Sequence, residues 1–173
     1  SYLAEVCRSK DIIVLETVAE QAAEWAGRAD ILICFEVMEH AHDPLKFLQS
    51  LYNLITKGGW VVISGLGVEG FDIQVLWEKS KSIFPPQHIN FISIKGFETL
   101  FAKAGFESVE VSTPGELDVD IVLNALQEDS SLEMGRFERL LLGREEGVLK
   151  EFQKFLAKQK LSSHCWISAR KPL

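Results

Sequence analysis

Long hydrophobic runs, paired cysteines and excess positive charge are all missing from this sequence. No stretch approaches the roughly 18 consecutive apolar residues of a membrane-spanning helix, and no signal peptide is recognisable. The three cysteines, Cys7, Cys34 and Cys165, are odd in number and lack the close spacing of a zinc site. The net charge of −7 argues against nonspecific binding to nucleic acid or acidic membranes, because phosphate contacts need a basic surface. We therefore expect a cytoplasmic protein with reduced thiols.

What the sequence does contain is an alternation of short apolar segments and amphipathic ones. Runs rich in β-branched residues predict strands near 11–16, 30–35, 60–65, 106–111 and 164–170. Helical periodicity predicts helices at 1–10, 18–27, 44–59, 70–84, 95–105, 118–128, 131–143 and 145–160. This alternation indicates an α/β fold, a doubly wound and mostly parallel sheet with helices on both faces. In such sheets the ligand site lies beyond the carboxyl ends of the strands.

A dense polar cluster follows one of the predicted strands. Glu36, Glu39 and His40 come directly after the apolar run DILICF, at spacings that place them on one face of a helical turn. Two carboxylates and an imidazole there could chelate a divalent cation. Alternatively, the glutamates cap and solvate a helix start while His40 packs beside them. His88 lies in the proline-braced loop PPQHIN, which suits either a catalytic residue or a structural hydrogen bond.

Other polar residues and glycines have simpler interpretations. Asp43, just before a proline, is expected to cap a helix, and His164 in the last predicted strand is interpreted as structural. Gly65, Gly67 and Gly70 match the count of a dinucleotide-binding glycine motif. No acid-bearing strand follows about twenty residues later, so we interpret these glycines as a flexible strand-to-helix turn.

The order of these signals resembles a known family. The string DILICFEVMEH…DP…FLQSLYNLITKGGWVVISG, followed by PPQHINFIS…GFETLFAKAGFESVEVSTPG, is similar to class I S-adenosylmethionine-dependent methyltransferases over nearly the whole chain. The resemblance implies a Rossmann-like sheet whose last strand is antiparallel to its neighbours, and methyl transfer to a small-molecule nucleophile. It also implies that Phe35 and Glu36 lie along the methionine part of the cofactor, S-adenosylmethionine, with Glu16 and Thr17 near its adenine.

The turn EVMEH also resembles the metal-binding turn of ubiquinone-pathway O-methyltransferases and of small-RNA 2′-O-methyltransferases. In those enzymes two glutamates and a histidine are joined by a further histidine from a later loop. The resemblance implies that Glu36, Glu39, His40 and His88 hold magnesium or manganese. As the alternative to a metal, His40 or His88 could accept the proton of the nucleophile, since imidazole titrates near neutral pH.

The sequence also departs from the family. The family's glycine-rich loop after the first strand, and the acid that ends the second, are not in this sequence. We expect residues 1–173 to form a single truncated methyltransferase-like domain that lacks the first two strands and binds the cofactor weakly or not at all. An alternative is a non-catalytic fragment that binds a partner chain or serves as a scaffold, with possible self-association through an exposed sheet edge. A metal-dependent hydrolase fits the strand order less well.

Overall fold

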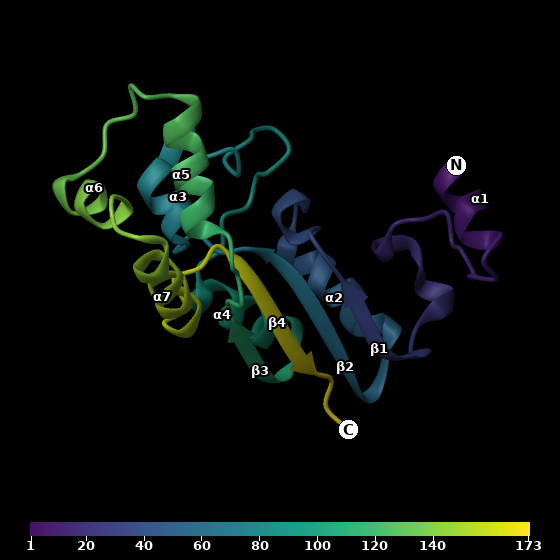
Figure 1. Ribbon diagram of the computed structural model, residues 1–173. Helices are drawn as coiled ribbons and strands as arrows, with labels where there is room; N and C mark the ends of the chain where they lie inside the picture. The colour runs from purple at the N-terminus through teal and green to yellow at the C-terminus, as the bar shows by residue number, and fades with distance from the viewer.

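A single four-stranded sheet organises the chain in this computed structural model, which describes residues 1–173. The strand order is β1-β2-β4-β3 (Figure 1). The strands are β1 (Ala29–Cys34), β2 (Ile55–Leu66), β3 (Glu107–Ser112) and β4 (His164–Arg170). β1 runs parallel to β2, and β4 is antiparallel to both of its neighbours, β2 and β3. Three strands therefore point the same way, and the predicted antiparallel last strand is confirmed.

Capping side chains and glycines next to the helices determine several of the helix boundaries. They are α1 (Tyr2–Arg8), α2 (Pro44–Leu54), α3 (Phe71–Leu76), α4 (Ile94–Ala104), α5 (Asp118–Glu128), α6 (Arg136–Leu142) and α7 (Glu146–Lys158). Asp43 caps α2 as predicted, because its side chain accepts a hydrogen bond from the Lys46 amide at 3.0 Å. Gly105 ends α4 in the left-handed conformation, with φ of 100°. None of these helices has the length and apolar character needed to cross a bilayer.

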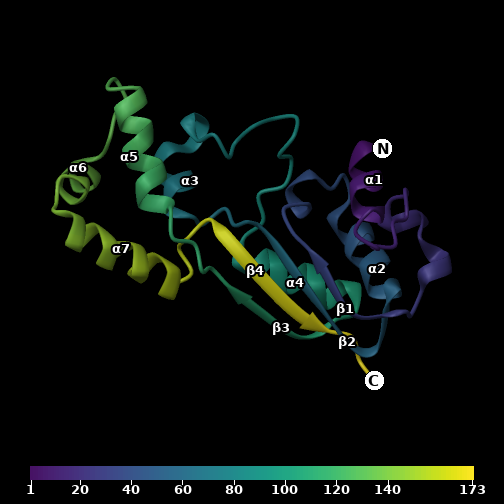
Figure 2. The same ribbon diagram turned by 45° about the vertical axis from the view of Figure 1, so that its right-hand side comes forward.

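Two clusters of buried apolar side chains hold the elements together. The larger one fills the space between the sheet and helices α2 and α4, where Ile63, Ile167 and Phe101 are completely buried. The smaller one lies among α3, α5, α6 and α7 and includes Val122 and Leu156. These four helices form a lobe beyond the carboxyl ends of β2 and β3 (Figure 2).

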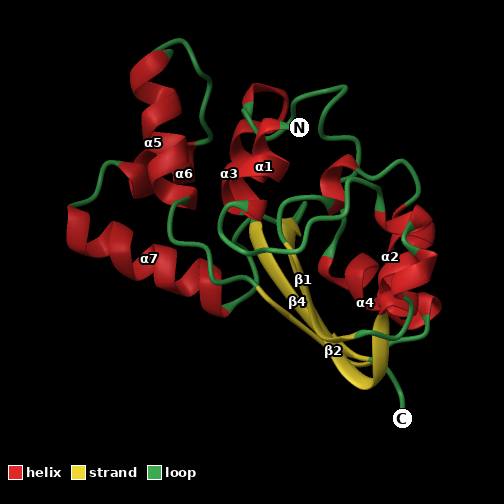
Figure 3. Ribbon diagram, turned by 90° about the vertical axis from the view of Figure 1, so that its right-hand side faces the viewer, coloured by secondary structure: helices red, strands yellow, loops and turns green.

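The opposite face of the sheet is largely uncovered. Helices α2 and α4 lie on one side of the sheet only (Figure 3). On the other side Ile31 and Ile33 of β1 are 65% and 61% exposed, and Trp60 and Trp166 are 41% and 40% exposed. Strand register places these four side chains on one surface, here named the open face. The expectation of helices on both faces is therefore met on one face only.

Two predictions near the amino-terminus are wrong. Residues 11–16 form no strand, because no neighbouring strand pairs with them, and Ile12 and Ile13 are 52% and 77% exposed. The helix predicted over 18–27 is two short 3-10 turns, Ala19–Gln21 and Ala23–Trp25. Farther along, α2 is shorter than predicted, since Ile55 already begins β2.

Candidate functional site

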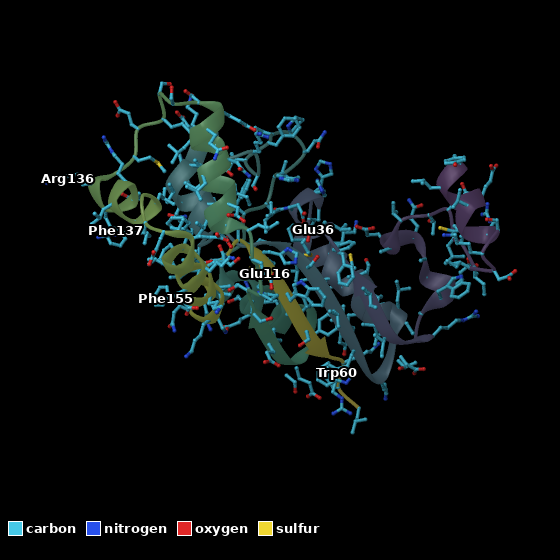
Figure 4. All side chains as sticks on the ribbon, in the orientation of Figure 1. Glu36, Trp60, Glu116, Arg136, Phe137 and Phe155 are labelled. Atoms are coloured by element: carbon cyan, nitrogen blue, oxygen red, sulfur yellow. The ribbon has the colours of Figure 1, made fainter.

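The turn after β1 is held in an unusual backbone conformation. Glu36 has φ of 52°, in the left-handed region that residues other than glycine seldom occupy. Its amide donates to the Ser64 carbonyl of β2 at 3.2 Å, and the Ser64 hydroxyl donates to Glu36 Oε1 at 2.5 Å. Figure 4 shows Glu36 at this end of the sheet, which is the carboxyl edge of β1 and β2. Strain that is held by surrounding contacts in this way is typical of functional sites.

A histidine from the last strand also reaches Glu36. His164 Nδ1 lies 3.6 Å from Glu36 Oε1, and Trp166 Nε1 donates to His164 Nε2 at 2.7 Å. Because an indole nitrogen only donates, His164 Nε2 accepts, and the proton of the neutral ring is on Nδ1, facing Glu36. The ring of Phe35 packs on Trp166 with centroids 5.3 Å apart. We call Phe35, Glu36, Ser64, His164 and Trp166 the Glu36 cluster.

Sequence reasoning missed the place of His164 in this cluster. The interpretation of His164 as structural is incomplete, because its ring also faces the carboxylate of Glu36. β4 pairs with β2 in a register that sets His164 opposite Leu66. This pairing joins segments about a hundred residues apart. The available signal was the resemblance, which implied that the last strand is antiparallel to its neighbours, but it did not supply the register.

Glu39, His40 and His88 form a second polar group, here named the Glu39 trio. Each offers one ligand atom, and these atoms all lie within 4.8 Å of one another. Glu39 and His40 belong to a 3-10 turn, Met38–His40, that follows β1, while His88 comes from the loop before α4. The two imidazole rings are 4.9 Å apart between centroids. The structure thus brings together three of the four predicted metal ligands. Glu36 is not in the trio, because its carboxylate turns to Ser64 and His164.

The loop that carries His88 is hydrogen-bonded onto the turn that carries Glu39. The amides of Ile89 and Asn90 both donate to the Glu39 carbonyl, at 2.8 and 3.1 Å. The Asn90 side-chain amide donates to the carbonyls of Met38 and Ala41, at 3.1 and 2.5 Å. These bonds explain why two segments about fifty residues apart present their side chains to one point.

In both histidines of the trio, a carbonyl group determines which ring nitrogen carries the proton. His40 Nδ1 lies 2.9 Å from the Gln87 carbonyl, and His88 Nδ1 lies 2.7 Å from the Ser82 carbonyl. A carbonyl oxygen can only accept, so Nδ1 of each ring is the donor. In the neutral imidazoles Nε2 therefore keeps its lone pair, which can bind a metal or accept a proton.

Glu39 is the buried member of the trio. Only 2% of the residue is exposed, and its Oε2 has no hydrogen-bond partner. Burial raises the pKa of Glu39, and the charge of Glu36 adds to the rise, whereas His40 and His88 counter it. A buried carboxylate without a partner, facing two imidazoles, is a donor set suited to a divalent cation.

The structure places Glu16 and Thr17 in a different environment. Glu16 accepts hydrogen bonds from the amino-terminal ammonium group at 2.8 Å and from Arg8 at 2.9 Å, and both lower its pKa. Thr17 Oγ1 lies 3.5 Å from Gln21 Oε1. Both residues are exposed, and their hydrogen bonds are to α1 and the adjoining turn rather than to the Glu36 cluster.

Two of the glycines after β2 allow close packing. A Cβ at Gly67 would overlap the Cys165 sulfur, and one at Gly70 would overlap the backbone of Ser163. Ser163 and the start of β4 therefore fill the space next to these glycines. This supports the interpretation of these residues as a turn between a strand and a helix.

Known proteins resemble this chain in sequence and in fold. The model of a family described as a methyltransferase domain matches residues 4–111. Ubiquinone biosynthesis O-methyltransferase of Escherichia coli O127:H6 is 40% identical over 57 residues, which are 33% of this chain and 24% of that enzyme. The chain thus matches about a quarter of the length of this curated relative.

Solved structures show the same fold. A methyltransferase of Thermotoga maritima, described as a possible histamine N-methyltransferase, aligns with a TM-score of 0.62 and 18% identity, over 99% of this chain and 69% of its own. A phosphoethanolamine N-methyltransferase of Haemonchus contortus, bound to phosphomonomethylethanolamine and S-adenosylhomocysteine, aligns with a TM-score of 0.50 and 20% identity. That alignment covers 86% of this chain and 34% of the other.

Proposed function

Because this chain belongs to the methyltransferase domain family, we propose that it takes part in S-adenosylmethionine-dependent methyl transfer to a small-molecule nucleophile. We treat residues 1–173 as one partial methyltransferase domain. The observation that supports the proposal best is the turn at Glu36. It combines a left-handed backbone with a carboxylate held by Ser64, at the carboxyl edge where open α/β sheets bind their ligands.

The proposed chemistry divides between cofactor and protein. S-Adenosylmethionine, when bound, would supply a methyl group on a sulfonium: the nucleophile would bond to the methyl carbon while the carbon–sulfur bond breaks and the sulfur keeps the bonding electrons. Phe35, which is 47% exposed, and Glu36 are the residues proposed to border its methionine part, and Glu16 and Thr17 are the weaker proposal for its adenine. Nε2 of His40 or His88 is the proposed acceptor of the nucleophile's proton, since carbonyls hold the ring proton on Nδ1.

As an alternative to proton acceptance by His40 or His88, we propose the Glu39 trio as a metal site. One buried carboxylate and two imidazoles with free Nε2 atoms suit manganese better than magnesium, because magnesium prefers ligand sets made of oxygen. A divalent cation held there would supply a positive charge that lowers the pKa of a substrate hydroxyl. Glu36, from the neighbouring cluster, would become a fourth ligand only if its hydrogen bond from Ser64 opened.

Manganese binding can be measured without any assay of activity. Titration with MnCl2 should raise the melting temperature by several degrees once the ion greatly exceeds its dissociation constant, because a ligand that binds only the folded state stabilises it. Glu39→Ala should remove this rise. Glu20→Ala, which changes an exposed glutamate of the amino-terminal segment, is the matched control. An unchanged manganese response in Glu39→Ala would eliminate the site.

Cofactor binding is best tested by NMR, because the family's glycine loop is not in this sequence and weak binding is expected. Addition of S-adenosylhomocysteine should shift the backbone amide signals of Phe35 and Glu36 in proportion to its concentration. Phe35→Ala should weaken the effect, whereas Tyr2→Ala, which removes an aromatic ring that is 76% exposed, should not. If millimolar ligand leaves both signals unmoved, the non-catalytic, partner-binding alternative becomes the better description.

A further inference from the structure

A cavity of about 420 Å³ lies between α3, α6 and α7, and it shares no residue with the Glu36 cluster or the Glu39 trio. Its wall is mainly aromatic and apolar, and includes Phe71, Phe137, Phe152, Phe155, Met134 and Leu156. Phe71 meets Phe152 edge to face at 5.1 Å, and Phe152 stacks on Phe155 at 6.1 Å between centroids. Phe137 and Phe155 extend from neighbouring helices of this lobe (Figure 4).

The charged groups of this cavity are all of one sign. Glu69, Glu133 and Glu138 line it, and no lysine, arginine or histidine does. None of the three glutamates forms a salt bridge, although the carboxylate of Glu69 accepts a hydrogen bond from the Ile94 amide at 3.0 Å. The nearby Arg139 is held by the Met134 carbonyl, to which its Nε donates at 2.9 Å. The negative charge around the cavity is therefore not paired within the chain.

Aromatic rings and carboxylates favour the same kind of ligand. The face of an aromatic ring carries negative potential and attracts a cation, and a carboxylate attracts it at longer range. The apolar wall offers few of the oxygen or nitrogen ligands that a metal ion needs, but it can bury the hydrocarbon part of an organic molecule. Phe137 and Phe155 are 65% and 49% exposed, so much of the aromatic surface is still available for contact.

From this combination we propose that the cavity between α3, α6 and α7 is a binding site for an organic cation, a substituted ammonium group attached to an aromatic or alkyl body. The ammonium group lies among the phenylalanine rings on the side of Glu133 and Glu138, and the apolar body lies against Met134 and Leu156. The site is separate from the proposed methyl-transfer site and does not depend on that proposal.

The two methionines of the chain allow a direct test. Met134 lines the cavity, whereas Met38 is buried next to the Glu39 trio and the sheet. In protein with ¹³C-labelled methionine methyl groups, benzyltrimethylammonium should shift the Met134 signal with a saturable dependence on concentration and leave Met38 in place. Benzyl alcohol, which is neutral, should bind several-fold more weakly, and benzoate, an anion, more weakly still.

Charge variants separate cation recognition from simple apolar binding. Glu133→Gln with Glu138→Gln should weaken benzyltrimethylammonium binding about tenfold and leave benzyl alcohol unaffected. Glu110→Gln, which changes an exposed glutamate on β3, is the matched control, and thermal melting verifies that each variant is folded. Equal affinity for the cation and the alcohol, a shift of Met38 instead of Met134, or no saturable shift of Met134 would each overturn the proposal.

Discussion

Asp72, in the first turn of α3, has no exposed surface, and neither of its carboxylate oxygens has a hydrogen-bond partner. Its neighbour Asp118 is also buried but is well satisfied, since it accepts hydrogen bonds from Gln153, the Ser162 hydroxyl and the Ser163 amide at 2.6–2.7 Å. Burial, with the charge of Asp118 as a further contribution, raises the pKa of Asp72 to about 6. Asp72 therefore holds a proton in the folded chain at a pH where an exposed aspartate has lost it.

The raised pKa predicts how stability depends on pH. Between about pH 4 and pH 6 the folded state binds a proton that the unfolded state has released. The contribution of this proton to the free energy of unfolding is therefore complete below this range and is lost as pH rises through it. The loss amounts to about 3 kcal/mol. Asp72→Asn should flatten this part of the profile and raise the free energy of unfolding at pH 7, as measured by urea denaturation.

The control for this measurement is Asp120→Asn, which changes an exposed aspartate of α5. It should keep the slope of the parent chain. If Asp72→Asn also keeps that slope, the proton responsible is bound elsewhere.

At the scale of elements, the connection from β2 to α3 depends on a glycine at position 70. Gly70 lies so close to the backbone of Ser163 that an added Cβ would displace the segment leading into β4. Gly70→Ala should therefore lower the free energy of unfolding by about 1–3 kcal/mol, the usual cost of overpacking. Gly147→Ala in α7 is the matched control, because a Cβ there meets nothing within 4 Å. It should stabilise the chain by up to about 1 kcal/mol. Similar effects of the two substitutions in denaturation curves would contradict this account.

Elements that depend on local chemistry could be predicted from the sequence. The start of α2 rests on Asp43 and the following proline, and the end of α4 rests on Gly105, so a few adjacent residues determine each boundary. Residues 11–16 have the composition of a strand, but a strand also needs a neighbour to pair with. Whether such a neighbour is present depends on the arrangement of the whole sheet, which local composition does not predict.

Some residues of the candidate site could likewise be predicted from the sequence, and others could not. Glu39 and His40 are close in sequence, so their shared turn was predictable, and the resemblance added His88. The position of Glu36 and the contribution of His164 were not predictable, because they follow from a left-handed backbone and from the register between β2 and β4. Both depend on contacts between distant parts of the chain.

For the whole molecule, the open face and the unpaired edge of β1 predict association. Ile31 and Ile33 expose more than half of their surface on a strand with one free edge, and such edges readily pair with another chain. We expect the apparent mass in sedimentation experiments to rise with protein concentration. Ile33→Lys should suppress this rise, whereas Ile12→Lys, at an isoleucine that is 52% exposed outside the sheet, should not. A constant monomer mass at all concentrations would contradict the prediction.

The order of the strands also determines when the fold can form during synthesis. β4 lies between β2 and β3, which do not pair with each other, so the middle of the sheet is filled by the last strand in sequence. A ribosome that has made β1, β2 and β3 has produced one parallel strand pair and a third strand without a partner. Because chains emerge from the amino-terminal end, the sheet cannot close until residues 164–170 have left the exit tunnel. Until then Ile63 of β2 and Val111 of β3 both lack Ile167, the β4 residue that pairs with each of them.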